Sequence, residues 1–161
     1  MNRIIYLFVF ILCQLNLSKA QNIPRLKTND LQYWTLQNSD TIFVINFWAT
    51  WCKPCISELN SFEKINKLYA DKKVKVILIN NDFKKQYETR LKPFVKEKNI
   101  KSSVFFMDES NPNSWIDRVN TDWGGAIPAT WIIQKSSNYE KFIEGSVSFE
   151  KLKEMIDPLI K

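Results

Sequence analysis

The chain has 161 residues, of which 45% are hydrophobic, so it is long enough to bury one ordinary core and we expect a single domain. Its formal net charge is +6, but the lysines are interspersed with acidic residues, which excludes a nucleic-acid-binding patch. Histidine is absent, which excludes attachment of c-type haem and leaves a zinc or copper site short of ligands.

Residues 1–20 have the pattern of a secretory signal. Arg3 precedes an uncharged run over residues 4–17, and Ser18-Lys19-Ala20 places small residues where a signal peptidase requires them. The strongly apolar part is shorter than the roughly 20 residues that span a bilayer. We therefore expect residues 1–20 to be cleaved and residues 21–161 to be exported to the cell envelope or periplasm. An uncleaved anchor over residues 4–17 is the alternative.

The exported part begins with a short segment, residues 21–26, that we expect to be flexible. Thr28-Asn29-Asp30 supplies capping residues for a helical turn that carries Leu31, Trp34 and Leu36. Thr41–Trp48 is a nearly continuous run of β-branched and aromatic residues, which predicts a central strand covered on both faces. Lys75–Asn80 has the same character. The residues between these two strands, Cys52–Tyr69, have a helical spacing of apolar side chains, so we predict a βαβ unit.

The second half of the chain continues the alternation of helices and strands. We predict a helix over Phe83–Lys98, capped by Asn81-Asp82 and kinked or broken at Pro93. A short strand over Ser103–Met107 and a short helix near Asn113–Val119 follow. The chain then ends with a hairpin of Ala129–Gln134 and Lys141–Glu144 joined through Lys135–Asn138, and a helix capped by Ser148 that buries Leu152, Met155, Ile156 and Leu159.

The pentapeptide Trp51-Cys52-Lys53-Pro54-Cys55 directly follows the first predicted central strand. Cleavage of the signal would also remove Cys13, which leaves these two cysteines as the only ones in the exported chain. A disulfide that closes so short a ring gains little from loop entropy, so the spacing favours a redox-active pair over a structural bridge.

The position of the motif predicts different roles for the two cysteines. Pro54 is tolerated in the first helical turn, where its missing N–H would have no partner, so the motif marks a helix start. The free N–H groups there favour the thiolate of Cys52, and Lys53 adds a positive charge. Cys55 lies one turn deeper and is shielded. We expect Cys52 to be the nucleophile and Cys55 the resolving thiol, joined as the Cys52–Cys55 redox disulfide when oxidised.

The segment from Asn46 to Cys55 (NFWATWCKPC) resembles the active-site segment of the thioredoxin superfamily, especially its exported TlpA/ResA-like disulfide reductases. The resemblance covers nearly all of residues 21–161. It implies an α/β thioredoxin fold, in which helices flank a central mixed β-sheet and an extra helix and strand are inserted before a cis-proline loop.

The Ile127-Pro128 pair supports this resemblance. In the family, an X-Pro peptide in the cis form lies beside the dithiol, and the backbone of the residue before the proline pairs with the substrate chain. The resemblance thus implies that Ile127 and Pro128 bind substrate, with a plain trans proline as the alternative. Trp51 resembles the family's exposed tryptophan and is expected to line the substrate groove or simply to pack. Gly124 and Gly125 precede the loop and allow close backbone approach.

Asn46 departs from the pattern of cytoplasmic thioredoxins, which carry a buried proton-shuttling aspartate at this position. Many exported relatives instead have a glutamate three residues after the second cysteine, where this chain has Glu58. That spacing brings the carboxylate near Cys55 on the helix surface. We expect Glu58 to relay the proton of Cys55. A carboxylate merely favoured near a helix N-terminus is the alternative.

The resemblance implies a thiol-disulfide oxidoreductase that reduces disulfides of exported proteins and draws electrons from a membrane thiol donor. We expect it to act as a monomer, without cofactor or metal. An oxidase or isomerase remains open, because reduction potential sets the direction of exchange. A non-catalytic module that holds partners beside Trp51 and Ile127 is a further alternative, and cytochrome maturation is one of several family roles.

Overall fold

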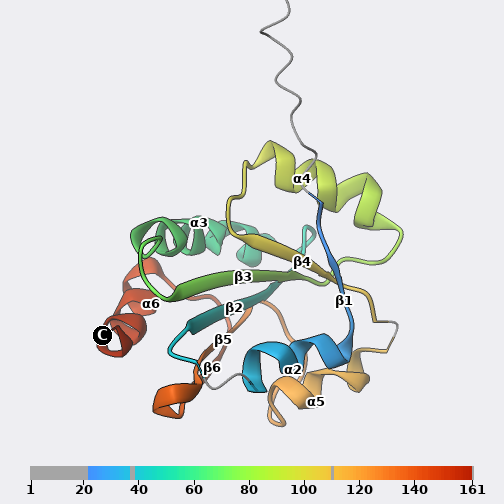
Figure 1. Cartoon of the computed structure of the whole chain (residues 1–161). Helices are drawn as coiled ribbons and strands as arrows, with labels where there is room; N and C mark the ends of the chain where they lie inside the picture. The colour runs from blue at the N-terminus through green and yellow to red at the C-terminus, as the bar shows by residue number, and fades with distance from the viewer. Residues whose placement is uncertain (1–21, 37–38, 110, 161) are drawn as a thin grey trace, which may run out of the picture.

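A computed structural model describes residues 22–160 except 37–38 and 110, so the predicted signal segment lies outside the described residues. Six strands form one sheet in the order β1-β4-β3-β2-β5-β6, with helices on both faces (Figure 1). Strands β1 to β4 are mutually parallel, whereas β5 and β6 run antiparallel to their neighbours. The predicted central mixed sheet is therefore confirmed.

The centre of the sheet is the predicted βαβ unit. Strand β2 (Ile42–Trp48) pairs in parallel with β3 (Val74–Asn80), and helix α3 (Lys53–Leu68) connects them. The register ends with Trp48 opposite Asn80, so both strands finish at the same edge of the sheet. The loops that follow the two strands are thereby brought together, as is usual at the carboxyl edge of parallel strands.

Two cores cover the faces of the sheet, because alternate residues of the buried strands point in opposite directions. Val44 and Trp48 of β2 pack with α3, α4 (Lys92–Glu97) and α6 (Phe149–Ile156), whereas Phe43, Ile45 and Phe47 pack with α2 (Thr28–Leu36) and α5 (Ile116–Val119). Figure 1 shows α3 and α4 on one side of the sheet and α2 and α5 on the other. Asn46 shares the α3 side with Val44 and Trp48.

The C-terminal hairpin brings a second chain segment to the end of β2. Strand β5 (Ala129–Gln134) pairs with β2, with Ala129 opposite Phe47, and β6 (Tyr139–Glu144) forms the outer edge. The connection is a 3-10 turn over Lys135–Ser137 that closes at Asn138 with a φ of 54°. Strand β6 begins two residues earlier than predicted. The start of β5, directly after Pro128, therefore lies beside the end of β2.

Residues 22–26 do not form a flexible lead-in, which corrects the sequence-based expectation for this segment. Arg25–Leu26 forms strand β1, which pairs in parallel with Phe106–Met107 of β4 (Ser103–Met107). The Phe106 N–H donates to the Pro24 carbonyl at 2.9 Å, and Ile23 is buried. A strand of two residues is too short to show an alternation of apolar and polar side chains. It can therefore be recognised only from its pairing with β4.

The predicted single helix over Phe83–Lys98 is also corrected. Residues 83–86 form a turn, Tyr87–Leu91 forms a π-helix, and α4 begins at Lys92. Pro93 explains the wide turn, since it has no N–H to donate and its ring crowds the carbonyl of the preceding turn. Asp82 does not cap this helix, because its side chain bonds to the loop after β2 instead.

The last helices follow their sequence signals more closely. The Ser148 hydroxyl accepts the Lys151 N–H at 3.1 Å, as expected of a cap, and Leu152 and Ile156 are buried. Helix α6 ends at Ile156, and Asp157–Leu159 continues as a 3-10 turn around Pro158. The predicted short helix near 113–119 is divided into a 3-10 turn, Pro112–Ser114, and α5. Across the described ranges, no helix is long and apolar enough to cross a membrane.

Candidate active site

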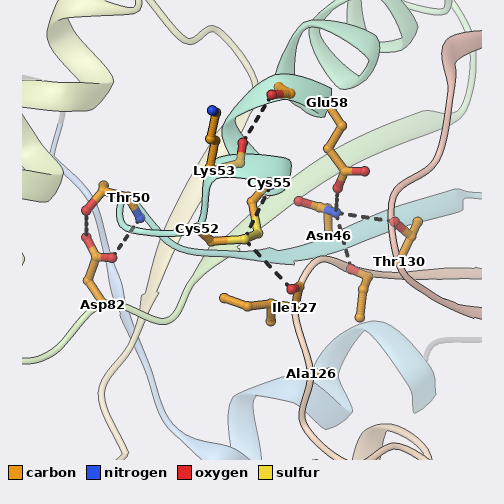
Figure 2. Close-up of a disulfide and its surroundings, with 12 residues drawn as sticks. Asn46, Thr50, Cys52, Lys53, Cys55, Glu58, Asp82, Ala126, Ile127 and Thr130 are labelled. Carbon is orange, nitrogen blue, oxygen red and sulfur yellow. Dashed lines mark hydrogen bonds between the residues drawn. A yellow bond between two sulfur atoms is a disulfide. The ribbon is translucent and has the colours of Figure 1, made fainter.

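The two cysteines form a disulfide at the start of α3 (Figure 2), with their Cα atoms 5.3 Å apart. Cys52 is the N-cap residue, and its sulfur accepts the Cys55 N–H at 3.3 Å. Cys52 is 6% exposed and Cys55 is fully buried. The outer sulfur is thus the one that a partner reaches first, and the helix N–H groups face it, which favours a thiolate there.

Lys53 and Pro54 occupy the first turn of α3, as predicted. Pro54 has no N–H group, and an N–H group in the first turn would have no acceptor within the helix. The Lys53 side chain is exposed, and Figure 2 shows its ammonium group pointing away from the two sulfurs. In this conformation the positive charge of Lys53 makes no direct contact with the Cys52 sulfur. The helix N-terminus does contact that sulfur, through the Cys55 N–H.

The loop before β5 forms the opposite wall of the site. The Ile127–Pro128 peptide bond is cis, as the resemblance implied. The Ile127 carbonyl oxygen lies 3.8 Å from the Cys52 sulfur, a contact drawn in Figure 2. The sulfur carries no hydrogen in the disulfide, so this contact becomes a hydrogen bond only in the reduced thiol. A backbone acceptor beside the outer sulfur is what an extended substrate chain would meet.

Glu58 lies on the face of α3 that packs into the core, where its side chain is buried. Its carboxylate accepts the Asn46 side-chain N–H at 2.9 Å and the Val147 backbone N–H at 2.8 Å. Burial raises the pKa of Glu58, and the hydrogen bonds from Val147 and Asn46 oppose this shift. Within the described residues the carboxylate makes no hydrogen bond to Cys55. A group so poised holds its proton closer to neutral pH than an ordinary glutamate.

Asn46 connects this carboxylate to the hairpin. Its amide nitrogen also lies 3.2 Å from the Ala129 carbonyl and 3.2 Å from the Thr130 hydroxyl. Its amide oxygen is buried without a hydrogen-bond partner, and Figure 2 shows it on the side of the disulfide. A buried acceptor without a donor is costly. The thiol of Cys55 in the reduced protein would be a donor on that side.

Two tryptophans flank the motif and have different surroundings. Trp48 is fully buried and belongs to the core on the α3 side. Trp51 is 48% exposed at the mouth of the site and stacks on Phe83, with ring centroids 6.4 Å apart and an interplanar angle of 23°. Phe83, which sequence reasoning assigned to a helix, is 63% exposed.

Asp82 is a site residue that sequence reasoning missed. Its carboxylate accepts the Thr50 N–H and the Thr50 hydroxyl, each at 2.8 Å, and Arg90 donates to the Thr50 carbonyl at 3.1 Å (Figure 2 shows the Asp82 bonds). Burial raises the pKa of Asp82, and the bonds from Thr50 oppose the shift. The sequence did contain a signal for this contact, since Asp82 follows shortly after a buried strand. Parallel strands end at a common edge of the sheet, so a residue after β3 is expected to lie near the loop after β2.

No cluster of three or more metal-ligating carboxylates and cysteines occurs in the described part of the chain. The site consists of the Cys52–Cys55 pair, the buried carboxylate of Glu58, the buried carboxylate of Asp82 that holds the Thr50 loop, and the Ile127 carbonyl on the opposite wall. These groups are suited to proton transfer and thiol-disulfide exchange.

The fold and the dithiol at a helix start, facing a cis-proline loop, define the class of thioredoxin-like thiol-disulfide oxidoreductases. Residues 19–140 match the AhpC/TSA family, and the chain belongs to this family.

Relatives of known name support the class. The chain is 26% identical over 148 residues to the thioredoxin-like protein YneN of Bacillus subtilis, covering 89% of this chain and 82% of YneN. It is 29% identical over 108 residues to the thiol-disulfide oxidoreductase ResA of Bacillus cereus, covering 67% of this chain but only 57% of ResA. The match thus spans little more than half of the curated ResA protein.

Solved structures confirm the fold. A thiol:disulfide interchange protein of Chlorobium tepidum superposes with a TM-score of 0.61 at 23% identity, covering 74% of this chain and 80% of that chain. A protein of Corynebacterium glutamicum described as a secreted thiol-disulfide isomerase gives a TM-score of 0.63 at 18% identity, covering 80% of this chain and 74% of that chain. The predicted thioredoxin fold and the predicted class of thiol-disulfide oxidoreductase are confirmed.

Proposed function

We propose that this protein reduces disulfides of exported proteins by a Cys52/Cys55 dithiol-disulfide cycle. The observation that carries the proposal is the placement of Cys52 at the N-terminus of α3 with its sulfur facing the Ile127 carbonyl. The Cys52 thiolate attacks one sulfur of a substrate disulfide, and the other substrate sulfur leaves as a thiol. Cys55 then attacks Cys52, which releases the second substrate thiol and leaves the Cys52–Cys55 disulfide.

Glu58 is the proposed proton acceptor for Cys55 in the second step. Cys55 must lose its proton before it attacks, and Glu58 is buried with a raised pKa on the same side of β2. Asn46 lies between them, with one bond to Glu58 and an unpartnered oxygen on the disulfide side. We infer that Asn46 orients the two groups and that the proton passes within this buried cluster.

The substrate chain is proposed to lie across the cis-proline loop. The backbone of Ile127 would pair with it, Pro128 would shape the groove, and Trp51 would contact it from the other side. The exposure of Trp51 beside an otherwise buried disulfide supports this arrangement. Lys53 and Pro54 would tune Cys52 through the charge and the geometry of the helix start.

Export supplies the setting for this reaction. Residues 1–20 are proposed to be a cleaved signal, with the anchor over residues 4–17 as the alternative, and the domain would act in the envelope as a monomer. The C. glutamicum structure described as secreted supports this setting. Since such compartments are oxidising, a reductase there requires an electron source, and we propose a membrane thiol donor.

Insulin-disulfide reduction with dithiothreitol as electron source tests the activity. We expect the domain of residues 21–161 to accelerate reduction and Cys52→Ser to abolish the acceleration. In envelope extracts, Cys55→Ser is expected to accumulate mixed disulfides that the unmodified protein releases. No acceleration together with no trapped partners would favour the non-catalytic module.

The direction of exchange is measured separately, by equilibrating the cysteine pair with defined ratios of reduced and oxidised glutathione. A potential more reducing than that of glutathione supports the reductase, because electrons then flow toward the substrate. A potential well above it would assign the protein to the oxidase or isomerase alternative.

A further inference from the structure

Two large apolar side chains are exposed side by side at the mouth of the dithiol site. Trp51 precedes the nucleophile in the chain, and Phe83 stacks on it from the loop after β3. Exposed rings of this size are unfavourable unless something covers them. Only four large hydrophobic residues are substantially exposed in the described part of the chain, and these are two of them.

A cavity of about 290 Å³ lies beside Phe83, which is one of its lining residues. Its apolar lining comes from Phe83, Met107, Pro112 and Trp115, and its polar lining comes from Asn81, Asp82, Lys84 and Glu109. Its volume falls just below the roughly 300–1,000 Å³ typical of pockets for drug-sized ligands, so it suits a single large side chain. The cavity and Phe83 together are called the Phe83 pocket.

The charged lining residues already have partners, Asp82 among them through Thr50, and Asn81 adds one buried amide oxygen without a hydrogen-bond partner. The part of the lining available to a ligand is therefore mostly apolar. Lys84 pairs with Asp108 at 2.9 Å, and Glu109 accepts the N–H and the hydroxyl of Thr28, each at 3.0 Å. Met107 and Trp115 supply a polarisable thioether and an indole, both of which favour aromatic contacts. The chemistry of the pocket therefore selects an apolar and preferably aromatic group.

Two loops that are hydrogen-bonded to each other connect the Phe83 pocket to the dithiol site. Thr50 and Trp51 lead into Cys52, and Asp82, bonded twice to Thr50, leads into Phe83. This double link fixes the loop that carries Phe83 to the loop that carries the nucleophile. A polypeptide held at Cys52 would thus present its neighbouring side chains to the exposed rings.

We propose that the Phe83 pocket is a specificity site that binds an aromatic side chain close to the reacting cysteine of a disulfide-bonded polypeptide substrate. The inference rests on the proposed function, whose substrate class it narrows. Phe83 acts as a platform shared with Trp51, and the cavity receives the ring. Substrates with a phenylalanine or tryptophan within a few residues of the cysteine are exchanged faster than those with glycine there.

The test uses single turnovers of the reduced protein, which need no electron donor. Synthetic peptides carry one cysteine as a mixed disulfide with thionitrobenzoate, and phenylalanine or glycine one to three residues to either side. Attack by Cys52 on the peptide sulfur releases coloured thionitrobenzoate, and attack by Cys55 then releases the peptide thiol. We expect the best phenylalanine peptide to react about tenfold faster than its glycine counterpart, as partial burial of one ring predicts.

Phe83→Ala is expected to reduce this preference to less than twofold. Tyr33→Ala is the matched control, because Tyr33 is 64% exposed on α2, outside the site, and its loss should leave the tenfold preference intact. A preference absent from the unmodified protein, or one retained in Phe83→Ala, would overturn the inference while leaving the reductase activity established.

A binding measurement tests the pocket even if no peptide is reduced. Cysteine-free versions of the peptides, with serine in place of the modified cysteine, are titrated into Cys52→Ser and followed by NMR. Shifts of Phe83, Met107 and the Trp115 indole with the phenylalanine peptide, and not with the glycine peptide, support the pocket. Shifts that follow protein concentration alone would mean that a second copy occupies it, and absence of shifts would mean that nothing of this class binds there; either overturns the inference.

Discussion

Glu58 and Asn46 form a buried, hydrogen-bonded polar pair on the α3 side of β2, the side that also carries the two cysteines. Asn46 cannot titrate, and it stands on the strand where a titrating group is found in cytoplasmic thioredoxins. The carboxylate comes instead from α3, three residues beyond Cys55, and reaches the same buried space. The Val147 N–H and the Asn46 amide stabilise its charged form, while burial disfavours it. The net effect is a raised pKa for Glu58, which supports its proposed role as the proton acceptor for Cys55.

Glu58→Gln is predicted to shift the titration of Cys55 to lower pH. The ionised carboxylate disfavours a second negative charge nearby, so its removal lowers the pH of half-maximal alkylation by about one unit. The measurement is iodoacetamide alkylation of Cys55 in a Cys52→Ser background between about pH 5 and pH 10. Glu63→Gln controls for loss of charge on the same helix, because Glu63 bonds instead to the backbone N–H groups of Lys101 and Ser102. An unchanged Cys55 profile would remove Glu58 from the mechanism.

The residues of the motif itself could be predicted from the sequence, whereas those that surround it could not. A helix start after a buried strand makes the roles of Cys52 and Cys55 follow from local rules. Glu58 was placed near Cys55 by helical spacing, but spacing alone did not show whether it faced water or the core. Asp82 and Phe83 belong to a different loop, and their contacts with Thr50 and Trp51 arise only when β2 and β3 pair.

Among the elements, the loop before β5 depends on one glycine. Gly125 has a φ of 83°, a conformation that side chains strongly disfavour, and an added Cβ would lie 2.7 Å from the Ile116 Cδ1 atom. A Cβ added at Gly124 would meet nothing within 4 Å, and the backbone there has no such φ. The sequence indicated that both glycines allow close approach, but only Gly125 is constrained.

Gly125→Ala is predicted to lower the free energy of unfolding by about 1–2 kcal/mol, the usual cost of a left-handed residue with a side chain. Because Gly125 sets the path to Ile127, we also expect slower insulin reduction. Gly124→Ala is the matched control and should change stability by less than about 0.5 kcal/mol. Urea unfolding of the oxidised proteins measures the difference. Equal effects of the two substitutions would contradict the assignment.

The elements that could be predicted are those with a strong internal signal. The apolar runs of β2, β3 and β5 indicate buried strands, and the Ser148 cap fixes the start of α6. Strand β1 has only two residues and exists because β4 offers it backbone partners. The π-helix before Pro93 could not be predicted, because a proline can either kink a helix or end it. Which of these occurs depends on tertiary packing.

At the scale of the whole molecule, two buried carboxylates link stability to pH. Burial raises the pKa of Glu58 above its ordinary value of 4.5 and that of Asp82 above 3.8. The folded protein therefore retains these protons to higher pH than the unfolded chain. Their contribution to stability is complete below the ordinary values and is lost as the pH rises through the raised ones.

Glu58→Gln and Asp82→Asn are each predicted to flatten the fall in stability between about pH 4 and pH 8. Asp108→Asn provides the opposite case. The hydrogen bond from Lys84 lowers the pKa of Asp108, so its contribution is present above the ordinary value and disappears as the pH falls. Urea unfolding of the oxidised proteins at intervals from about pH 2 to pH 8 measures all three slopes, with that of Asp108 expected below its ordinary pKa of 3.8. A Glu58→Gln curve parallel to that of the unmodified protein would show that the carboxylate does not retain its proton.

The two edges of the sheet also affect how the molecule behaves among its own copies. Strand β1 presents only two residues, and β6 carries Glu140, Lys141 and Glu144 among its six. A short edge and a charged edge both disfavour pairing with the strand of another molecule. Exchange chemistry repeatedly brings reactive chains together, and edges of this kind keep such encounters from growing into fibrous aggregates.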